Sequence, residues 1–221
     1  MKYRVTGTTL PLVEVSLSKD ESIYAQSGSL LMLWEGVTFQ TELTGGALQG
    51  LRRLAGGEHF YTCKYVSDVD GGKVLLSDPT IGMIKELTIT EDEPILCDRG
   101  AFLCCDSTVN FDIAFMKRVR DVLFSGEGVV LQRLSGSGTA LLHCWGEVVE
   151  YTLDKDESIR VSSGNVVAFS TTVKLETRVM SGGKNILFGG EGIFITELKG
   201  PGKVIVQSVD KKELMHMIHE M

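Results

Sequence analysis

The sequence contains little proline and little histidine, and it lacks the long apolar runs that mark membrane proteins. Four prolines and four histidines occur among 221 residues, and aromatic residues make up 7%. No stretch approaches the roughly 20 apolar residues that a membrane-spanning helix needs, so we expect no membrane span. No apolar segment follows Lys2 and Arg4. We therefore expect neither a secretory signal nor a transit peptide, and we predict a cytoplasmic protein.

The motifs of common catalytic and cofactor sites are also missing. There is no nucleophile elbow, P-loop or dinucleotide fingerprint in the context that each requires. His216 and His219 are three residues apart but have no third ligand nearby, and His143 shares an expected strand with Leu141 and Trp145, which favours a core or interface position. The sequence thus predicts no catalytic residues, no metal and no cofactor, and a protein that is not an enzyme.

Positive charge is scarce, which bears on the partners of the protein. The formal net charge is −7, and the densest basic runs, Arg52–Arg53 and Lys117–Arg120, are short and flanked by apolar residues. Because phosphate recognition needs a basic patch, we expect no nucleic-acid partner. The five cysteines form no regular framework, which indicates reduced thiols that pack as small core side chains. The remaining composition, with 43% hydrophobic residues, is that of a globular chain, and we predict a single domain over residues 1–221.

The most informative positive feature is an internal repeat. Three segments share the pattern Asp-Glu-x-Ile, a glycine seven residues after the glutamate, and a valine nine residues after that glycine; they begin at Asp20, Asp92 and Asp156. Agreement at this many positions predicts three repeats, over about 1–83, 84–149 and 150–209. The units are longer than solenoid repeats, so we expect them to close around a pseudo-threefold axis.

Each repeat also contains a glutamate beside glycines. These residues, Glu58, Glu127 and Glu191, are the only candidate binding residues that the sequence offers. Recurrence at equivalent places favours a structural role in turns or ring closure, because a catalytic site usually breaks repeat symmetry. Convergence of the three carboxylates on a cation near the axis is the alternative.

Local patterning indicates strands in every repeat. Val13, Val15 and Leu17 alternate with polar residues, and a similar alternation continues from Val37 and from Val204. Period-two patterns with β-branched residues between glycine-rich turns predict an all-β fold. Helical spacing is limited to 110–124, the short segment 47–54 and a C-terminal helix over 210–221, for which Asp210 is the expected N-cap.

Several of these segments together resemble a known family. The sequence around Gly57-Glu58, the segment from Gly189 to Phe194, and the turn Gly200-Pro201-Gly202 are similar to the altered-inheritance-of-mitochondria family, which is described as similar in fold to the tryptophan RNA-binding attenuation protein. The resemblance covers nearly the whole chain. It implies an all-β, double-stranded β-helix-like fold and self-association, with a trimer as the expected state, and it transfers no catalytic residue.

The sequence leaves two functions open. The first is a non-enzymatic scaffold or binding protein that acts as a homo-oligomer. The second is a small-ligand-binding protein or an enzyme with a pocket in the β-repeats. The sequence does not identify a ligand or a protein partner for either one.

Overall fold

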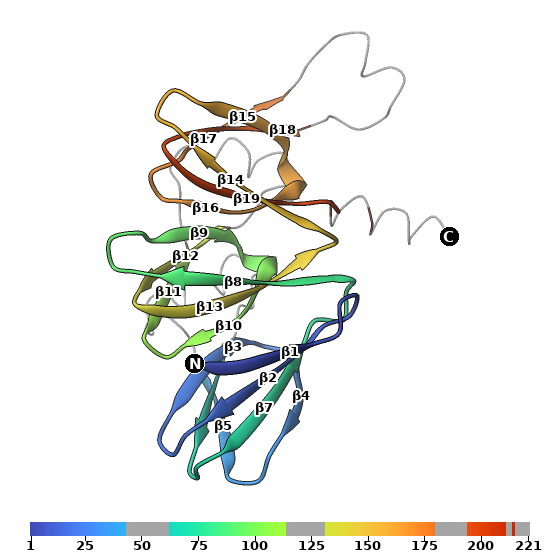
Figure 1. Ribbon diagram of the computed structural model, residues 1–221, viewed down its shortest axis with the longest axis vertical. Helices are drawn as coiled ribbons and strands as arrows, with labels where there is room; N and C mark the ends of the chain where they lie inside the picture. The colour runs from blue at the N-terminus through green and yellow to red at the C-terminus, as the bar shows by residue number, and fades with distance from the viewer. Residues whose placement is uncertain (43–61, 114–130, 180–193, 211–213, 215–221) are drawn as a thin grey trace, which may run out of the picture. The chain divides into compact units, whose positions relative to one another are not determined.

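The structure is a computed structural model that describes residues 1–42, 62–113, 131–179, 194–210 and 214. Within these ranges the chain forms strands β1 to β19 and two 3-10 helices of three residues each, η1 (Arg99–Ala101) and η2 (Ser163–Asn165). Neighbouring strands pair antiparallel, as β1 does with β2 and β2 with β7 (Figure 1). The prediction of an all-β fold is confirmed.

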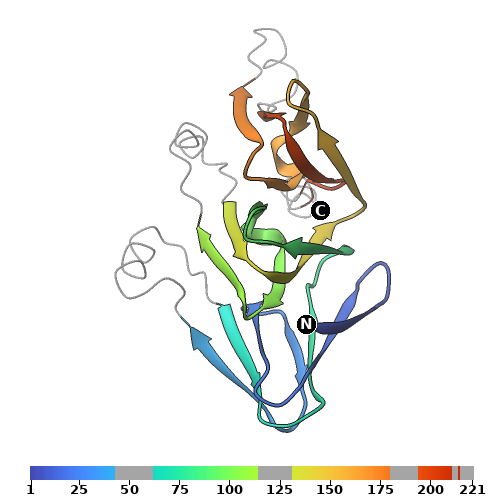
Figure 2. The same cartoon turned by 60° about the vertical axis from the view of Figure 1, so that its left-hand side comes forward.

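Four sheets contain all of the strands, and the first two draw on residues before position 146. Sheet A has four strands in the order β1 (Lys2–Thr6), β2 (Leu12–Leu17), β7 (Gly72–Ser77), β4 (Leu30–Leu33). Sheet B has six strands in the order β5 (Val37–Glu42), β6 (Thr62–Ser67), β3 (Ser22–Gln26), β10 (Phe102–Asp106), β13 (Gly138–Trp145), β8 (Gly82–Ile89). The β1–β2 hairpin is the dark blue ribbon beside the N label in Figure 2.

The other two sheets contain the later strands. Sheet C has six strands in the order β11 (Val109–Ile113), β12 (Leu131–Gly136), β9 (Ile95–Asp98), β16 (Val166–Ser170), β19 (Gly202–Gln207), β14 (Val148–Leu153). Sheet D has three strands in the order β15 (Ser158–Ser162), β18 (Phe194–Lys199), β17 (Lys174–Val179).

Alternating side chains explain why these segments form strands. In β2, Val13, Val15 and Leu17 are buried while the residues between them are partly exposed, and β7 follows the same rule with Val74 and Leu76. Successive side chains of a strand point to opposite faces, so this pattern places one apolar face of sheet A on the core. In contrast, β13 is buried continuously from Ala140 to Trp145, as expected for a strand inside a sheet that is covered on both faces.

The chain divides into two compact units, and each has its own apolar core. Unit 1 comprises Met1–Pro94, Gly100–Asp112 and Arg133–Cys144; unit 2 comprises Ile95–Arg99, Ile113–Gln132 and Trp145–Met221. The core of unit 1 joins residues of β2 and β7 to Ile23, Tyr65 and Leu141 of sheet B. The core of unit 2 joins residues of sheet C, such as Phe169 and Val204, to Leu198 of sheet D. Each core therefore lies between two sheets, as in β-sandwiches.

The expected helix over 110–124 is wrong for its first four residues, which belong to β11. Phe111 is buried and Asp112 is exposed, so the segment alternates with the period of a strand. The Phe111 ring packs against Tyr24, with ring centroids 5.2 Å apart, and against Phe102 at 5.7 Å. These contacts outweigh the helical spacing of the apolar residues that follow, because tertiary packing overrides a local pattern.

The other expected helices cannot be compared with the structure. Residues 47–54 and the rest of 114–124 lie outside the described residues, as do 211–213 and 215–221 of the C-terminal helix. At the start of that helix, the Leu214 amide donates to the carbonyl of Asp210, at 3.1 Å. The C-terminal helix stays a prediction, and so do the single domain and the boundaries of the repeats.

Candidate functional site

The three candidate binding glutamates of the sequence, Glu58, Glu127 and Glu191, lie outside the described residues. The structure therefore does not test whether they meet. The glutamates of the Asp-Glu turns are described, and two of them act in the turns themselves. The Glu21 carboxylate accepts a hydrogen bond from the Ser18 amide at 2.8 Å, and Glu157 accepts one from the Asp154 amide at the same distance. A carboxylate that binds the backbone three residues earlier stabilises the turn.

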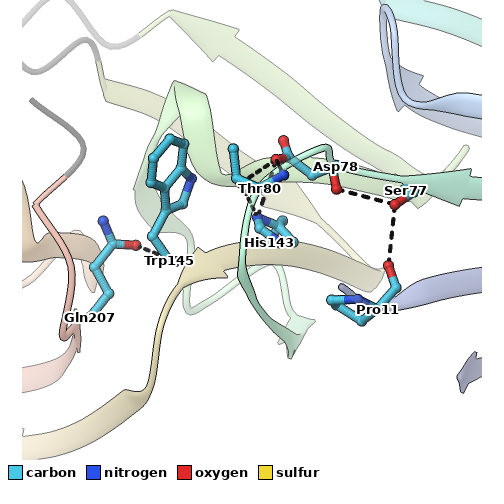
Figure 3. Close-up of polar contacts among 7 residues, drawn as sticks. All are labelled: Pro11, Ser77, Asp78, Thr80, His143, Trp145 and Gln207. Atoms are coloured by element: carbon cyan, nitrogen blue, oxygen red, sulfur yellow. Dashed lines mark hydrogen bonds and ion pairs between the residues drawn. The ribbon is translucent and has the colours of Figure 1, made fainter. Parts of the chain in front are cut away.

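In unit 1, the polar side chains around His143 form the group that most resembles a catalytic arrangement (Figure 3). The His143 ring comes from β13 and is 1% exposed. Its Nδ1 lies 3.5 Å from the Thr80 hydroxyl oxygen and 3.7 Å from Asp78 Oδ1. Asp78 Oδ1 also accepts hydrogen bonds from the amide of Thr80, at 3.0 Å, and from the Thr80 hydroxyl. An imidazole beside a carboxylate is the arrangement that orients a general base.

The environment of His143 argues for a structural role. Its Nε2 is buried and has no hydrogen-bond partner among the described residues, so the nitrogen that would act on a substrate is closed off from solvent. Burial lowers the pKa of His143, and the nearby Asp78 carboxylate and the Thr80 backbone oppose that effect in part. The ring is thus neutral at neutral pH and ties the segment before β8 to β13. The prediction of a core position for His143 is confirmed.

The same segment is held by neighbours in the β1–β2 hairpin. The Ser77 hydroxyl lies 3.1 Å from the carbonyl of Asp78 and 3.4 Å from that of Pro11 (Figure 3). The Gly82 amide donates to the carbonyl of Thr9 at 2.9 Å. Residues 77–82 are therefore fixed on two sides, by the hairpin and by β13.

The cysteines behave as small apolar side chains. Cys97, Cys104, Cys105 and Cys144 are buried, Cys63 is partly buried, and all five are free thiols. Burial raises the pKa of Cys104 strongly, and the Asp106 carboxylate adds to that effect. A thiol that resists ionisation is a poor nucleophile, so Cys104 is a packing residue.

Two buried glutamines, which the sequence analysis did not single out, differ in how well their amides are satisfied. Gln207 in unit 2 accepts a hydrogen bond from the Trp145 amide at 2.9 Å and donates one to the carbonyl of Gly164 at 3.3 Å (Figure 3). Gln132 is 2% exposed, yet neither its Oε1 nor its Nε2 has a hydrogen-bond partner in the part of the chain that the structure describes. A buried amide without partners is costly, and no periodicity in the sequence marks it.

Apolar side chains are exposed on strands at the edges of the sheets. On β4, the edge of sheet A, Leu31 is 58% and Met32 43% exposed, and on β14, the edge of sheet C, Val149 and Tyr151 are each 48% exposed. An edge strand presents unpaired backbone donors and acceptors beside these side chains. This combination suits the addition of another polypeptide, because backbone hydrogen bonds and apolar contacts form together.

In the described part of the chain, no group of three or more His, Cys, Asp or Glu side chains is arranged to hold a metal ion. Nor does any helix there have the length and hydropathy required to span a membrane.

These features define a class: an all-β protein built from antiparallel sheets, with two sandwiched cores and open apolar edges. Residues 3–209 match the sequence profile of the family described as Mitochondrial biogenesis AIM24, so the chain belongs to that family. The family membership predicted from the sequence is confirmed, whereas the likeness to the attenuation protein stays a prediction.

Two relatives from Streptococcus pyogenes support the assignment. The chain is 31% identical to an uncharacterized protein of the serotype M6 strain, over 92% of this chain and 83% of that protein. It also resembles the crystal structure of a structural-genomics target from the same species, with a TM-score of 0.80 and 26% identity over 99% of this chain and 98% of that one. Neither relative carries an assigned activity in its description.

Proposed function

We propose that this protein is a non-enzymatic scaffold or binding protein that works as a homo-oligomer in the cytoplasm. The observation that carries the proposal is the exposure of large apolar side chains on open strand edges, Leu31 and Met32 on β4 and Val149 and Tyr151 on β14. Exposed apolar patches of this kind mark surfaces that meet other proteins. The five free thiols fit a reducing compartment.

The proposal includes an internal repeat of a six-stranded, double-stranded β-helix-like unit. Its support is the order of strands in the sheets. Three groups of neighbouring strands have corresponding orders, namely β2-β7-β4, β8-β13-β10 and β14-β19-β16. Each strand of a group comes six strands after its counterpart in the group before. The same rule relates β5-β6-β3, β11-β12-β9 and β17-β18-β15. Three copies that pair with one another through β3–β10 and β9–β16 would produce the four observed sheets. The pseudo-threefold arrangement of the copies stays a prediction.

Native mass spectrometry of the purified protein at micromolar concentration tests the proposal. We expect a defined homo-oligomer, with a trimer as the preferred state, and no additional mass per chain. A monomer would contradict the scaffold proposal, because a protein that works by self-association must assemble at its working concentration.

The alternative is a small-ligand-binding protein or an enzyme. The observation in its favour is the pair formed by the buried His143 and the partly exposed Asp78, since a carboxylate that faces an imidazole recurs in catalytic sites. A reproducible mass increment per chain in the same experiment, lost in the His143→Gln variant, would favour this alternative. The matched variant His219→Gln, at a histidine in the C-terminal segment, serves as the control.

A further inference from the structure

Two strand pairings join each proposed repeat to the next, and both have the same register. Strand β10 pairs antiparallel with β3, which sets Cys104 opposite Ala25 (Figure 1). Strand β16 pairs antiparallel with β9, which sets Ala168 opposite Cys97. Because strands six apart along the chain correspond, Ala168 holds the place of Cys104 and Cys97 holds the place of Ala25. The same two surfaces thus make this contact twice within one chain.

The same series leaves one strand unused at each end. Strand β4 comes six strands before β10, and β15 comes six strands after β9. Among the described strands, β4 has β7 as its one neighbour and β15 has β18. The first repeat therefore has an open edge of the kind that β10 and β16 use for pairing. The last repeat has an open edge of the kind that β3 and β9 use.

The backbone of β4 has the shape of the corresponding strands that do pair. A bulge lies between Leu30 and Met32, where β4 pairs with β7. The same irregularity lies between Phe102 and Cys104 of β10, and at the matching place in β16. A bulge often keeps an edge strand from pairing, but β10 and β16 have a neighbour on both sides. The bulge therefore does not block the open edge of β4.

Strand β15 presents its open edge as β3 does. It pairs with β18 in the register in which β3 pairs with β6. At the start of β15, the Gly200 amide donates to the Glu157 carbonyl at 3.0 Å. The corresponding bond at the start of β3 runs from the Ser67 amide to the Glu21 carbonyl, at 3.1 Å. Backbone groups alternate sides along a strand, so the free groups of β15 have the phase of those with which β3 binds β10.

Burial shows what the edge of β4 lacks. Leu31 is 58% and Met32 43% exposed, whereas their counterparts Leu103 and Cys104 in β10 are 1% and 0% exposed. The residues at the same places in β16 are equally buried. Strand β4 contains no charged residue and no proline, which are the usual means of keeping an edge strand from pairing. It is therefore an apolar edge whose counterparts are covered by a neighbouring strand.

We propose that β4 of one copy of this chain pairs antiparallel with β15 of the next copy, as β10 pairs with β3 and β16 pairs with β9. The register of those two pairings sets Met32 opposite Val161, Leu33 opposite Arg160 and Trp34 opposite Ile159. This inference rests on the proposed homo-oligomer and names the surfaces that form it.

The side chains of the two edges fit this pairing. Cys104 and Ala25 meet in the apolar core of unit 1, and Val161 already packs against the core of unit 2. Met32 of the next copy would extend that second core, and its apolar surface would leave water. Arg160 is the one charged residue of β15, and its guanidinium lies 3.6 Å from Glu197 of the same sheet. No like charges therefore meet along the contact.

The contact is head-to-tail, because β4 and β15 are different surfaces. Each copy that joins covers one edge of its neighbour and brings one open edge of its own. Such an interface closes into a ring when the rotation between copies allows it. A ring of one size has a single mass, which is compatible with the expected trimer.

The first test uses paired cysteine variants. Met32→Cys and Val161→Cys chains are co-expressed with tags of different mass and treated with a short bifunctional maleimide. Directly opposite residues of an antiparallel pair have Cβ atoms about 4.5–5.5 Å apart, within reach of the reagent. We expect the mixed product to exceed either product of like chains several-fold. Val149→Cys, at a comparably exposed position on β14, replaces Met32→Cys as the control and should give no mixed product.

A second variant measures assembly directly. Leu31→Lys should convert the oligomer to monomer in native mass spectrometry, because the pairing would bury the lysine where β10 has Leu103. The monomer should keep the circular dichroism spectrum of the wild type, since Leu31 is largely exposed within one chain. Ile81→Lys, at a position that is 61% exposed before β8, should leave the mass unchanged.

The other outcomes overturn the inference in distinguishable ways. Products that join two Met32→Cys chains would assign the interface to paired β4 strands. An oligomer that persists in Leu31→Lys, with no mixed product in the cross-linking test, would reject this interface and leave the proposed scaffold standing. A wild-type protein that is a monomer at micromolar concentration would reject both the interface and the scaffold.

Discussion

Asp78 Oδ1 lies 3.7 Å from Nδ1 of His143, and these two residues are brought together by the folding of the segment before β8 onto β13. The pairing does not compensate for the burial of the ring, since burial is the larger effect and lowers the pKa of His143 from its usual 6.5. The folded state therefore disfavours the protonated imidazole, which the unfolded chain accepts freely.

A pH dependence of stability follows from this lowered pKa. As pH falls below about 6.5, the unfolded chain takes up a proton at His143 before the folded chain does, so the contribution of this group to stability is lost on acidification. We expect urea denaturation to show a steeper loss of stability between about pH 7 and pH 5 in the wild type than in His143→Gln. Equal slopes in the two proteins would contradict a buried neutral imidazole.

The two buried glutamines should respond in opposite directions to the same substitution. In Gln132→Leu an amide without partners is replaced by an apolar side chain, which is expected to be neutral or to stabilise the protein by about 1 kcal/mol. Gln207→Leu leaves the Trp145 amide unpaired and should destabilise by about 1–3 kcal/mol. Denaturant midpoints of both variants provide the measurement. A large loss of stability in Gln132→Leu would show that the Gln132 amide makes a bond that the structure does not describe.

The strands could be predicted from the sequence because burial in sheets follows a period of two. Val13, Val15 and Leu17 are buried, as their alternation indicates. This pattern depends on residues close together in the chain. The segment from Asn110 was misassigned because its strand conformation depends on contacts outside the segment. Phe111 packs against Tyr24, which is remote in sequence, and against Phe102, which lies on a different strand.

The sites could not be predicted in the same way. Asp78 and His143 lie far apart in the sequence, and no spacing rule connects them. The exposure of Tyr151 was also hidden, because β14 shares the alternating pattern of the buried strand β2 but, among the described strands, lies at the edge of its sheet. Burial at an edge depends on what pairs with it, and that information is not contained in the strand itself.

Asp106, at the end of β10, offers a test of the contacts that hold the start of β13. Its Oδ2 accepts a hydrogen bond of 2.7 Å from the Thr139 amide, and its Oδ1 lies 2.8 Å from the amino group of Met1. In Asp106→Asn the side chain keeps its size but loses its charge and one acceptor, so we expect a loss of about 1–3 kcal/mol. Asp112→Asn, at an exposed carboxylate on β11, is the control and should change stability by less than about 0.5 kcal/mol. Equal effects of the two substitutions in guanidinium titrations would contradict the role of Asp106.

Among the described glycines of unit 1, Gly82 should be the least tolerant of substitution. A Cβ at this position would lie 1.9 Å from the Cys144 carbonyl oxygen and 3.0 Å from Cε1 of His143. The closer atom belongs to the backbone of β13 and cannot turn aside, so Gly82→Ala must separate β8 from β13. We expect a loss of more than about 3 kcal/mol, above the usual range for overpacking.

Gly71→Ala is the matched comparison for that substitution. Gly71 has φ of +78°, but nothing lies within 4 Å of an added Cβ, so only the backbone strain of about 1–2 kcal/mol applies. Thermal unfolding of both variants at several pH values separates the steric clash at position 82 from the backbone strain at position 71. The Gly82→Ala variant should also alter the acid sensitivity that His143 confers, whereas the Gly71→Ala variant should retain it. If the two alanines cost the same and leave the pH profile unchanged, the close approach of β8 to the Cys144 carbonyl is not what makes glycine necessary at position 82.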